Sequence, residues 1–179
     1  MKKVTLDAGH GGNDPGAVSE KLREKDITLK IALYAEEYLL KNYQVLVKMT
    51  RSNDVFVTLN ERTKIANRFN SDLFVSIHVN AGGQGTGFES YTYTEIGEQT
   101  RKLQSILHNE IIKTMNEYTH IKDRGLKTAH YFVLKKTKMP AVLTENLFID
   151  LDGDLLSKEE FLKEVGIAHA RGIAEFLQL

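Results

Sequence analysis

Three ionisable side chains stand close to the ends of apolar, strand-like segments of the sequence. His10 lies in the glycine-rich turn of LDAGHGG, residues 6–12, His78 lies near the end of DLFVSIHVN, and Glu145 lies near the end of PAVLTENLF. Binding and catalytic groups of open α/β sheets gather at the carboxyl ends of the strands. Taken alone, His10 is consistent with a metal ligand, a catalyst or a polar loop residue, so its role depends on partners from elsewhere in the chain.

The periodicity of the segment around His78 predicts a strand with one apolar face and one face that becomes polar. Successive strand residues alternate between faces, so His78 and Asn80 share a face with Phe74 and Ser76. The opposite face carries Leu73, Val75, Ile77 and Val79. This pattern suits a binding site, and it suits equally a core histidine that has a hydrogen-bond partner.

Glu145 interrupts a segment that otherwise reads as buried. It shares a strand face with Ala141 and Leu143. A carboxylate in that position must be paired, metal-bound or protonated, because an unpaired buried charge is costly. We favour a functional role for Glu145 over the alternative of a structural ion pair with an arginine or lysine.

Glu24 precedes an apolar helical stripe by three residues and so extends the stripe by one turn. The stripe consists of Ile27, Ile31, Tyr34 and Tyr38. A helix that packs this face on a sheet carries Glu24 toward the sheet at its N-terminal end. The alternative is that Glu24 only complements the helix dipole, as carboxylates in a first turn do.

These four side chains form a chemically meaningful set if they converge at one sheet edge. His10 and His78 with one of the two carboxylates would form a zinc ligand set known from hydrolases, which leaves a position for water. The other carboxylate can then serve as general base. We expect surface or structural roles for the other histidines: His108, His120, His130 and His169.

The elements that must position these residues alternate between strands and helices. Strands are predicted at residues 2–8, 44–50, 72–80, 87–93, 129–135 and 140–148, and helices at 24–41, 58–69, 97–117 and 159–177. This order predicts a single α/β domain over residues 1–179, with three layers and a mostly parallel, twisted sheet of about six strands covered by helices on both faces. The segment at 81–95 has little helix between two strands, so it could add an antiparallel strand.

Composition excludes several other classes of function. The 179 residues carry 24 Lys and Arg against 24 Asp and Glu, so a nucleic-acid-binding protein is not indicated. The chain has no cysteine and no phosphate-loop motif, which removes thiol chemistry and phosphate-loop nucleotide binding. No apolar run reaches the length of a membrane span, and the short one at the N-terminus does not read as a signal peptide.

Separate motifs resemble, in the same order, those of the zinc-dependent N-acetylmuramoyl-L-alanine amidases of the amidase-3 type, which are bacterial cell-wall hydrolases. LDAGHGGNDPGA and SDLFVSIHVNA resemble the motifs of the two histidine ligands, which fall on His10 and His78. REKDITL resembles the glutamate-ligand segment, with Glu24, and DRGLKTAHYFVLKKTKMPAVLTE the segment that leads to the catalytic glutamate, Glu145. TRSNDVFVTLNERTKIAN resembles a further family stretch, which contains Thr50, Arg51, Asp54, Arg62 and Asn67.

The resemblance implies one Zn²⁺ held by His10, Glu24 and His78, with Glu145 as general base. The implied reaction is hydrolysis of the amide between the lactyl group of N-acetylmuramic acid and the L-alanine of the peptidoglycan stem peptide. After Glu145 the chain reads NLFIDLDGD, whereas the family often has a small or apolar residue, an aromatic and a Ser-Asn pair. This departure bears on substrate contacts near that segment and leaves the glutamate itself in place.

The same resemblance implies a place of action and partners. We expect an autolysin or phage endolysin that acts at the bacterial cell wall, with peptidoglycan as substrate and as a monomer, and with any wall-binding domain outside these residues. Contact with the substrate carbonyl or an acidic stem peptide is a weaker expectation for Asn80, Arg124 and Lys127, which are equally consistent with a loop hydrogen bond or solvated charges. A zinc peptidase that cuts within the stem peptide and a non-catalytic wall-binding module are the rival functions.

Overall fold

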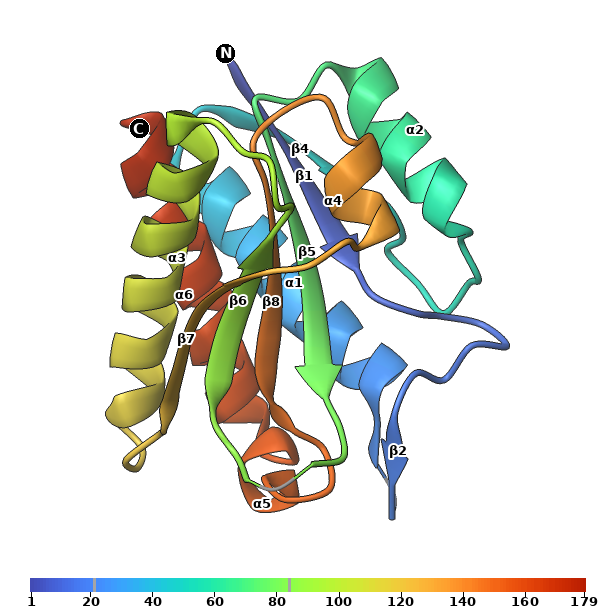
Figure 1. Cartoon of the computed structure of the whole chain (residues 1–179), viewed down its shortest axis with the longest axis vertical. Coiled ribbons are helices and arrows are strands. Elements are labelled where there is room, and N and C mark those ends of the chain that lie inside the picture. Colours follow the sequence, from blue (N-terminus) through green and yellow to red (C-terminus); the bar gives the residue numbers. More distant parts are fainter. Residues whose placement is uncertain (21, 84) are drawn as a thin grey trace.

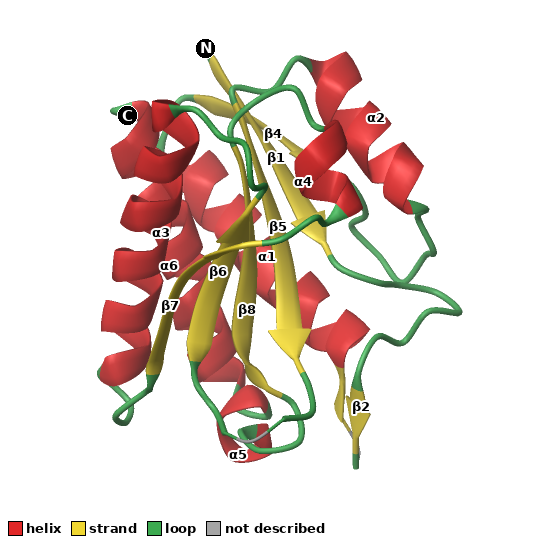
Figure 2. Ribbon diagram, viewed as in Figure 1, coloured by secondary structure: helices red, strands yellow, loops and turns green. Residues whose placement is uncertain are grey.

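The computed structural model describes residues 1–20, 22–83 and 85–179, in which a six-stranded sheet lies between two layers of helices (Figures 1 and 2). The first half of the chain forms β1 (Lys2–Ala8), β2 (Val18–Ser19), β3 (Leu22–Arg23), α1 (Glu24–Asn42), β4 (Val45–Met49), α2 (Leu59–Phe69) and β5 (Leu73–Asn80). The second half forms β6 (Phe88–Thr92), α3 (Glu98–Asn116), β7 (Asp123–Thr128), α4 (Phe132–Lys136), β8 (Ala141–Phe148), α5 (Gly153–Leu156) and α6 (Glu159–Leu177).

The strand order of the main sheet is β4-β1-β5-β8-β6-β7. Strands β4, β1, β5 and β8 run parallel to one another, and β6 pairs antiparallel with β8 and parallel with β7. The predicted fold class is confirmed, as is the antiparallel strand suggested between residues 81 and 95. The carboxyl ends of β1, β5 and β8 therefore meet at one edge of the sheet.

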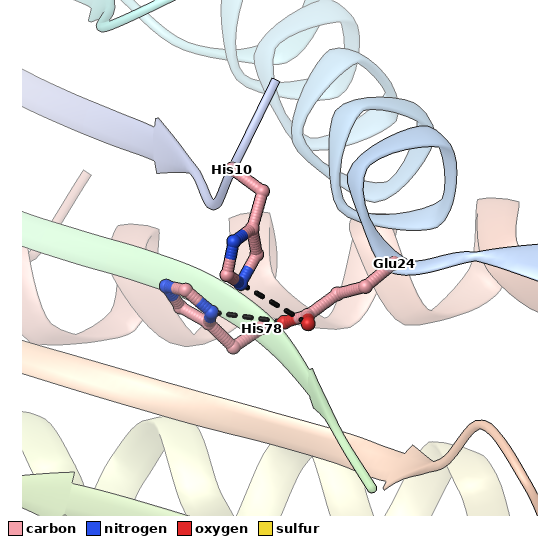
Figure 3. Close-up of side chains that lie close together, drawn as sticks. All are labelled: His10, Glu24 and His78. Carbon is pink, nitrogen blue, oxygen red and sulfur yellow. Dashed lines mark hydrogen bonds and ion pairs between the residues drawn. The ribbon is translucent and has the colours of Figure 1, made fainter. Parts of the chain in front are cut away.

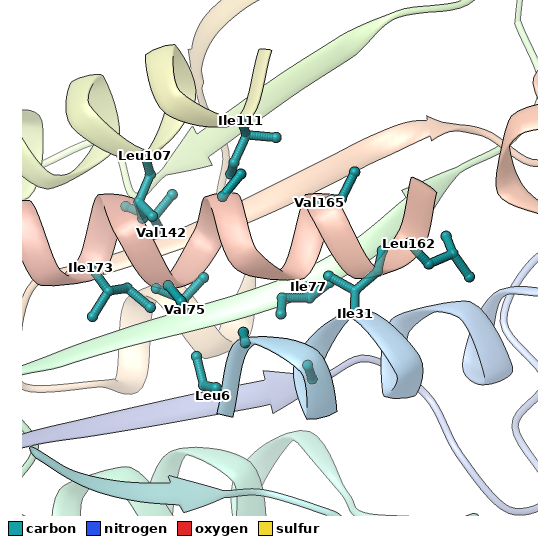
Figure 4. Packing of buried hydrophobic residues seen from close by; sticks show 14 of the residues in the cluster. Leu6, Ile31, Val75, Ile77, Leu107, Ile111, Val142, Leu162, Val165 and Ile173 are labelled. Carbon is teal, nitrogen blue, oxygen red and sulfur yellow. The ribbon is translucent and has the colours of Figure 1, made fainter. Parts of the chain in front are cut away.

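The larger part of the core lies between the sheet and the layer formed by α1, α3 and α6 (Figure 4). Val75 and Ile77 of β5 belong to this cluster and are fully buried, as are Ile31 of α1 and Ile173 of α6. The alternation predicted for β5 is thus confirmed: its apolar face packs on the three-helix layer. The polar face of the same strand turns to the opposite side of the sheet.

The second side of the sheet has a smaller core beneath α2 and α4. It consists of Ala66, Phe74, Val133, Leu134, Ala141 and Leu143. These two helices cover only part of this side, because α2 packs on β1 and β4 and α4 packs on β8. Glu145 of β8 shares its strand face with Ala141 and Leu143, so it points to the same, partly covered side.

The strand predicted at residues 129–135 is wrong. Residues 129–131 form a connection and α4 occupies Phe132–Lys136, while the sixth strand is β7, just before this segment. The apolar pair Val133 and Leu134 that suggested a strand is buried on one side of a short helix, against the smaller core. β7 escaped prediction because it is an edge strand whose sequence, DRGLKT, lacks apolar alternation.

Two small elements were also not predicted. A short antiparallel hairpin, β2 and β3, precedes α1, and the single-turn helix α5 precedes α6.

None of the helices among the described residues combines the length and apolar content that a bilayer crossing requires.

His169 of α6 makes the stability of this core sensitive to pH. Its Nδ1 donates to the carbonyl oxygen of Val165 at 2.7 Å, and its Nε2 lies 2.9 Å from Thr144 Oγ1. Burial lowers the pKa of His169 to about 4, below the ordinary 6.5, so the unfolded chain takes up the proton first as the pH falls. This contribution to stability is complete above pH 6.5 and is lost between there and pH 4.

We therefore expect the free energy of unfolding to fall by about 3 kcal/mol over this pH range because of His169 alone. Denaturant unfolding of the wild-type protein and of His169→Gln at several pH values measures the difference. Other groups titrate in both proteins, so the informative quantity is the difference between the two proteins in the slope of the free energy of unfolding against pH. Equal pH slopes in the two proteins would contradict the assignment.

Candidate metal centre and active site

Three of the residues singled out in the sequence lie together at the carboxyl edge of the sheet (Figure 3). His10 follows β1, Glu24 begins α1 and His78 belongs to β5, and one potential ligand atom from each lies within 4.8 Å of the other two. Glu24 stands between the imidazoles: its Oε2 is 3.1 Å from His10 Nε2 and its Oε1 is 2.9 Å from His78 Nδ1. The predicted convergence of these residues is confirmed.

His10 is held in a strained backbone conformation, with φ of 60°. Non-glycine residues rarely adopt this left-handed region, and they do so chiefly where the surrounding structure enforces it, often at functional sites. Asp14 Oδ2 lies 2.8 Å from His10 Nδ1, which fixes the imidazole with Nε2 toward Glu24. Asp14 was not predicted from the sequence, although its position four residues after His10 in the same turn was the available signal.

The carboxylate of Glu24 is buried and accepts backbone as well as side-chain hydrogen bonds. Oε2 accepts from Ala17 N at 2.9 Å and Oε1 accepts from Val79 N at 3.0 Å. Burial opposes ionisation, but hydrogen bonds from His10 and His78 outweigh it, so the pKa of Glu24 is far below its ordinary value. Glu24 is therefore a fixed anion between two imidazoles, which goes beyond the simple role of a helix-dipole partner.

The carboxylate of Glu24 shifts the pKa of both imidazoles. Burial alone would lower the pKa of each, but the hydrogen bonds and charge of Glu24 raise the pKa of both His10 and His78 above the ordinary value. Glu24 therefore favours the protonated form of both imidazoles, whereas metal binding requires the neutral form, so a cation entering the cluster would compete with protons.

Two glycines keep this cluster compact. A Cβ on Gly9 would lie 2.5 Å from Cε1 of His78, and a Cβ on Gly16 would lie 2.5 Å from Oε2 of Glu24. Gly16 also has a φ of 65°, which any side chain would make costly. The glycines at these two positions therefore leave the room that the side chains of His78 and Glu24 occupy.

Two buried arginines fix the turn that carries His10. Arg51 donates to the carbonyl oxygens of Ala8 and Gly9, and Arg62 donates to those of Ala8 and His10. Arg62 also donates to Asp7 Oδ1 at 2.8 Å. Although burial raises the pKa of Asp7, the charge of Arg62 and the surrounding hydrogen bonds hold it below its ordinary value.

The other positions singled out in the stretch TRSNDVFVTLNERTKIAN also form structural contacts. Thr50 Oγ1 donates to Asp7, Asp54 pairs with Lys25 and accepts from Gly12 N, and Asn67 bonds the backbone of residues 136 and 138. Sequence reasoning placed these positions by resemblance only. Their contacts link the His10 turn, α1 and α2 into one rigid support.

Glu145 lies beside the cluster, because its strand position in β8 is in register with His78 in β5. Its Oε2 is buried and has no hydrogen-bond partner among the described residues. Burial raises the pKa of Glu145 to about 7, with a smaller contribution from the charge of Glu24 that the imidazole of His78 opposes. A carboxyl with these properties can hold or release a proton near neutral pH, as a general base must.

A pocket of about 440 Å³ joins these groups, which is a size that accepts a small organic group. His10, His78 and Glu145 line it together with a rim of partly exposed apolar and aromatic side chains: Phe56, Val57, Leu59, Tyr131 and Phe132. The weaker candidates Asn80, Arg124 and Lys127 lie outside this lining. All three instead contact Glu89 of β6, a residue that sequence reasoning did not single out.

The other histidines lie away from the cluster. His108 lies between Ser90 and Asp123, but Ser90 is fully buried, so this serine–histidine–aspartate chain has no access to a substrate. His120 is exposed, and His130 Nδ1 contacts the hydroxyl of Tyr93. Structural or surface roles are therefore supported for His108 and, with the core contacts above, for His169.

Comparisons with known proteins agree with this geometry. A family model described as N-acetylmuramoyl-L-alanine amidase (Amidase_3) matches residues 4–175. The endolysin of Bacillus phage SPP1 is 50% identical over 182 residues, covering 99% of this chain and 67% of that protein. The sporulation-specific N-acetylmuramoyl-L-alanine amidase of Bacillus subtilis (strain 168) is 44% identical, covering 100% of this chain and 69% of that protein.

A solved structure extends the similarity to the fold. The catalytic domain of CwlV, an N-acetylmuramoyl-L-alanine amidase from Bacillus (Paenibacillus) polymyxa var. colistinus, superposes with a TM-score of 0.92 at 34% identity, over 99% of each chain. The family match spans nearly the whole sheet and both helical layers. This chain belongs to the Amidase_3 family of N-acetylmuramoyl-L-alanine amidases.

Proposed function

We propose that this chain hydrolyses the amide bond between the lactyl group of N-acetylmuramic acid and L-alanine of the peptidoglycan stem peptide, with one zinc ion and Glu145 as general base. The matching family model and the sporulation-specific relative of Bacillus subtilis carry the name N-acetylmuramoyl-L-alanine amidase, which supports this bond as the substrate. The observation that carries the mechanism is the compact set of His10, Glu24 and His78 with the unpartnered carboxyl oxygen of Glu145 beside it.

The three ligand candidates fit zinc by their chemistry. Imidazole nitrogens and a carboxylate oxygen are donors that zinc accepts, and three protein ligands are typical of catalytic rather than structural zinc sites. Asp14 would fix the orientation of His10 in the way that outer carboxylates fix metal-bound histidines. Zinc held by these residues would supply Lewis-acid chemistry, which would polarise a carbonyl and acidify water.

Glu145 would move the proton. Its unpartnered Oε2 accepts a proton from the attacking water, and the same carboxyl then donates that proton to the nitrogen of the leaving amine. The buried position keeps the proton affinity of this carboxyl high enough for the second transfer. The apolar rim of the pocket would limit the access of competing water to the reacting carbonyl.

We further propose that residues 1–179 act as one zinc amidase catalytic domain at the bacterial cell wall, as an autolysin or endolysin does. Relatives that include a phage endolysin and a sporulation-specific amidase support this setting. Several relatives are longer than the matched region, which supports a partnership with wall-binding domains in that group of proteins.

The test is a digest of purified peptidoglycan with metal content measured on the same preparation. The proposed reaction frees L-alanine amino termini, leaves the glycan strands uncut and requires about one zinc per chain. Amino termini from inside the stem peptide would instead identify a zinc peptidase. Retention on cell walls without any new amino terminus would identify a wall-binding module.

Gly9 gives a separate test of the ligand geometry. Gly9→Ala places a methyl group in the space of the His78 imidazole, so the ring must shift from its position beside Glu24. We expect zinc affinity to fall by about 10- to 100-fold, as for other changes that misorient a ligand. Competition with a chelator measures this affinity in the wild type and the variant.

Gly97→Ala is the matched control, because a Cβ at Gly97 meets no atom within 4 Å and its φ of −78° suits any residue. An unchanged zinc affinity in Gly9→Ala would show that His78 is not a ligand or that its ring is free to move. Thermal unfolding of both variants shows whether the fold is retained.

A further inference from the structure

We propose that Arg124 and Lys127 form a subsite for a carboxylate of an acidic stem peptide, anchored by Glu89. This inference rests on the proposed function and specifies which part of the substrate lies on which side of the pocket. It is carried by a network of side chains on β6 and β7 that adjoins Glu145.

The network begins one strand away from the proposed general base. Glu89 of β6 is in register with Glu145 of β8, which is in register with His78 of β5. Register partners on neighbouring strands point to the same side of a sheet, so these three side chains form a row across its surface. Arg124 and Lys127 belong to β7, the next strand in this row.

Glu89 is only 2% exposed, and its two oxygens are fully engaged as acceptors. Oε1 accepts from Asn80 Nδ2 at 2.7 Å and from the Tyr91 hydroxyl at 2.9 Å, while Oε2 accepts from Arg124 Nε at 2.8 Å and from Lys127 Nζ. Burial raises the pKa of Glu89, but these hydrogen bonds outweigh it and hold the carboxyl ionised. The carboxylate therefore positions two cations side by side.

One carboxylate does not neutralise two cations, so this network has a surplus of one positive charge. Both cationic side chains reach solvent: 24% of the Arg124 side chain and 35% of the Lys127 side chain is exposed. The Arg124 guanidinium also lies 4.9 Å from the centre of the Phe148 ring, which restricts its orientation. A prepositioned pair of cations that still reaches solvent is suited to bind an anion.

The distance between this pair of cations and Glu145 suits a peptide carboxylate that lies close to the scissile amide. Neighbouring strands are about 4.8 Å apart, so β7 lies about 10 Å from β8 and Glu145. An extended peptide covers this distance within about three residues. The α2 and α4 helices lie over β1, β4 and β8 on this side rather than over β6 and β7 (Figure 1).

The opposite side of the pocket is lined by Phe56, Leu59 and Phe132, which are partly exposed apolar side chains. The arginine of the lining, Arg62, is buried and paired with Asp7, so it does not offer a comparable anion site. The ring centre of Tyr131, which lines the pocket, lies 5.4 Å from that of Tyr91, whose hydroxyl donates to Glu89, so a chain of side-chain contacts links the pocket to the cationic pair. An acidic peptide leaving the reacting amide is therefore directed over β6 toward β7.

Two synthetic muramoyl peptides test this orientation: one with free side-chain carboxylates and one with the same groups as neutral amides. For Lys127→Met and Arg124→Gln we expect KM for the acidic peptide to rise about 10- to 100-fold, with little change in kcat. KM for the amidated peptide should stay at the wild-type value. Lys127→Arg should restore the preference, and Lys163→Met, a change of an exposed lysine on α6, should leave it intact.

A measurement without substitutions uses salt. KM of the wild type for the acidic peptide should rise with ionic strength, because partly exposed charges are screened, while KM for the amidated peptide should not. Equal KM values for the two peptides in the wild type, or equal losses on both in the variants, would overturn the subsite. If the wild type cleaves neither peptide, the proposed function fails and the subsite falls with it.

Discussion

Replacing Glu145 with glutamine should abolish most hydrolysis while leaving zinc bound. Glutamine has nearly the shape of glutamate but cannot accept the proton of the attacking water, and general-base catalysis accounts for about 10²- to 10⁴-fold in rate. Glu145 Oε2 forms no hydrogen bond among the described residues, so the substitution breaks no contact of the folded chain. It also removes a buried ionisable group, which should leave stability equal or slightly higher.

The measurement combines release of L-alanine amino termini with elemental analysis of zinc on the same sample. Glu95→Gln is the matched control, since Glu95 is exposed and lies away from the pocket. Hydrolysis by Glu145→Gln at the wild-type rate would refute the assigned role. Loss of zinc together with activity would instead identify Glu145 as part of the metal site.

The sequence was sufficient to predict which face of its element carries His78 and which carries Glu24. The alternation in β5 predicted that His78 lies on the face opposite Val75 and Ile77. In the structure, Val75 and Ile77 are fully buried in the larger core. The helical stripe placed Glu24 with Ile27 and Ile31 on the buried face of α1, whereas Tyr34 and Tyr38 of the same stripe are only partly buried. These predictions succeeded because one face of each element is buried, and burial leaves a period that a single sequence shows.

Edge positions were harder to predict, because a strand at the edge of a sheet need not bury a complete face. β7 is such a strand, and its polar sequence concealed both the strand and the contacts of Arg124 and Lys127 with Glu89. The apolar residues Val133 and Leu134, by contrast, suggested a strand where a five-residue helix is present. A short apolar run does not distinguish the two, since both bury it against the same core.

Polar contacts between distant segments were beyond prediction from periodicity. The ion pair between Arg62 and Asp7 spans 55 positions, and the contact of Lys127 with Glu89 spans 38. Charged residues are ordinary on a solvated surface, so nothing local distinguishes a buried pair from an exposed one. The resemblance named Arg62 as a family position, and the structure supplies the reason: this residue fixes the carbonyl of the strained His10.

Replacing His10 with alanine should remove zinc and activity together. Two ligands, Glu24 and His78, would remain, and a catalytic zinc site ordinarily needs three protein donors. We expect bound zinc to fall from about one per chain to a small fraction of that value. His120→Ala is the matched control, because His120 is exposed and far from the cluster in the sequence.

The combination of the two variants separates binding of the metal from proton transfer. Glu145→Gln should be inactive with zinc, and His10→Ala should be inactive without it, so a chelator should change nothing further in His10→Ala. Excess zinc should restore part of the activity to His10→Ala and none to Glu145→Gln, since only the first defect lies in affinity. Stoichiometric zinc in His10→Ala would remove this residue from the metal site, and the strained φ of 60° would then need another explanation.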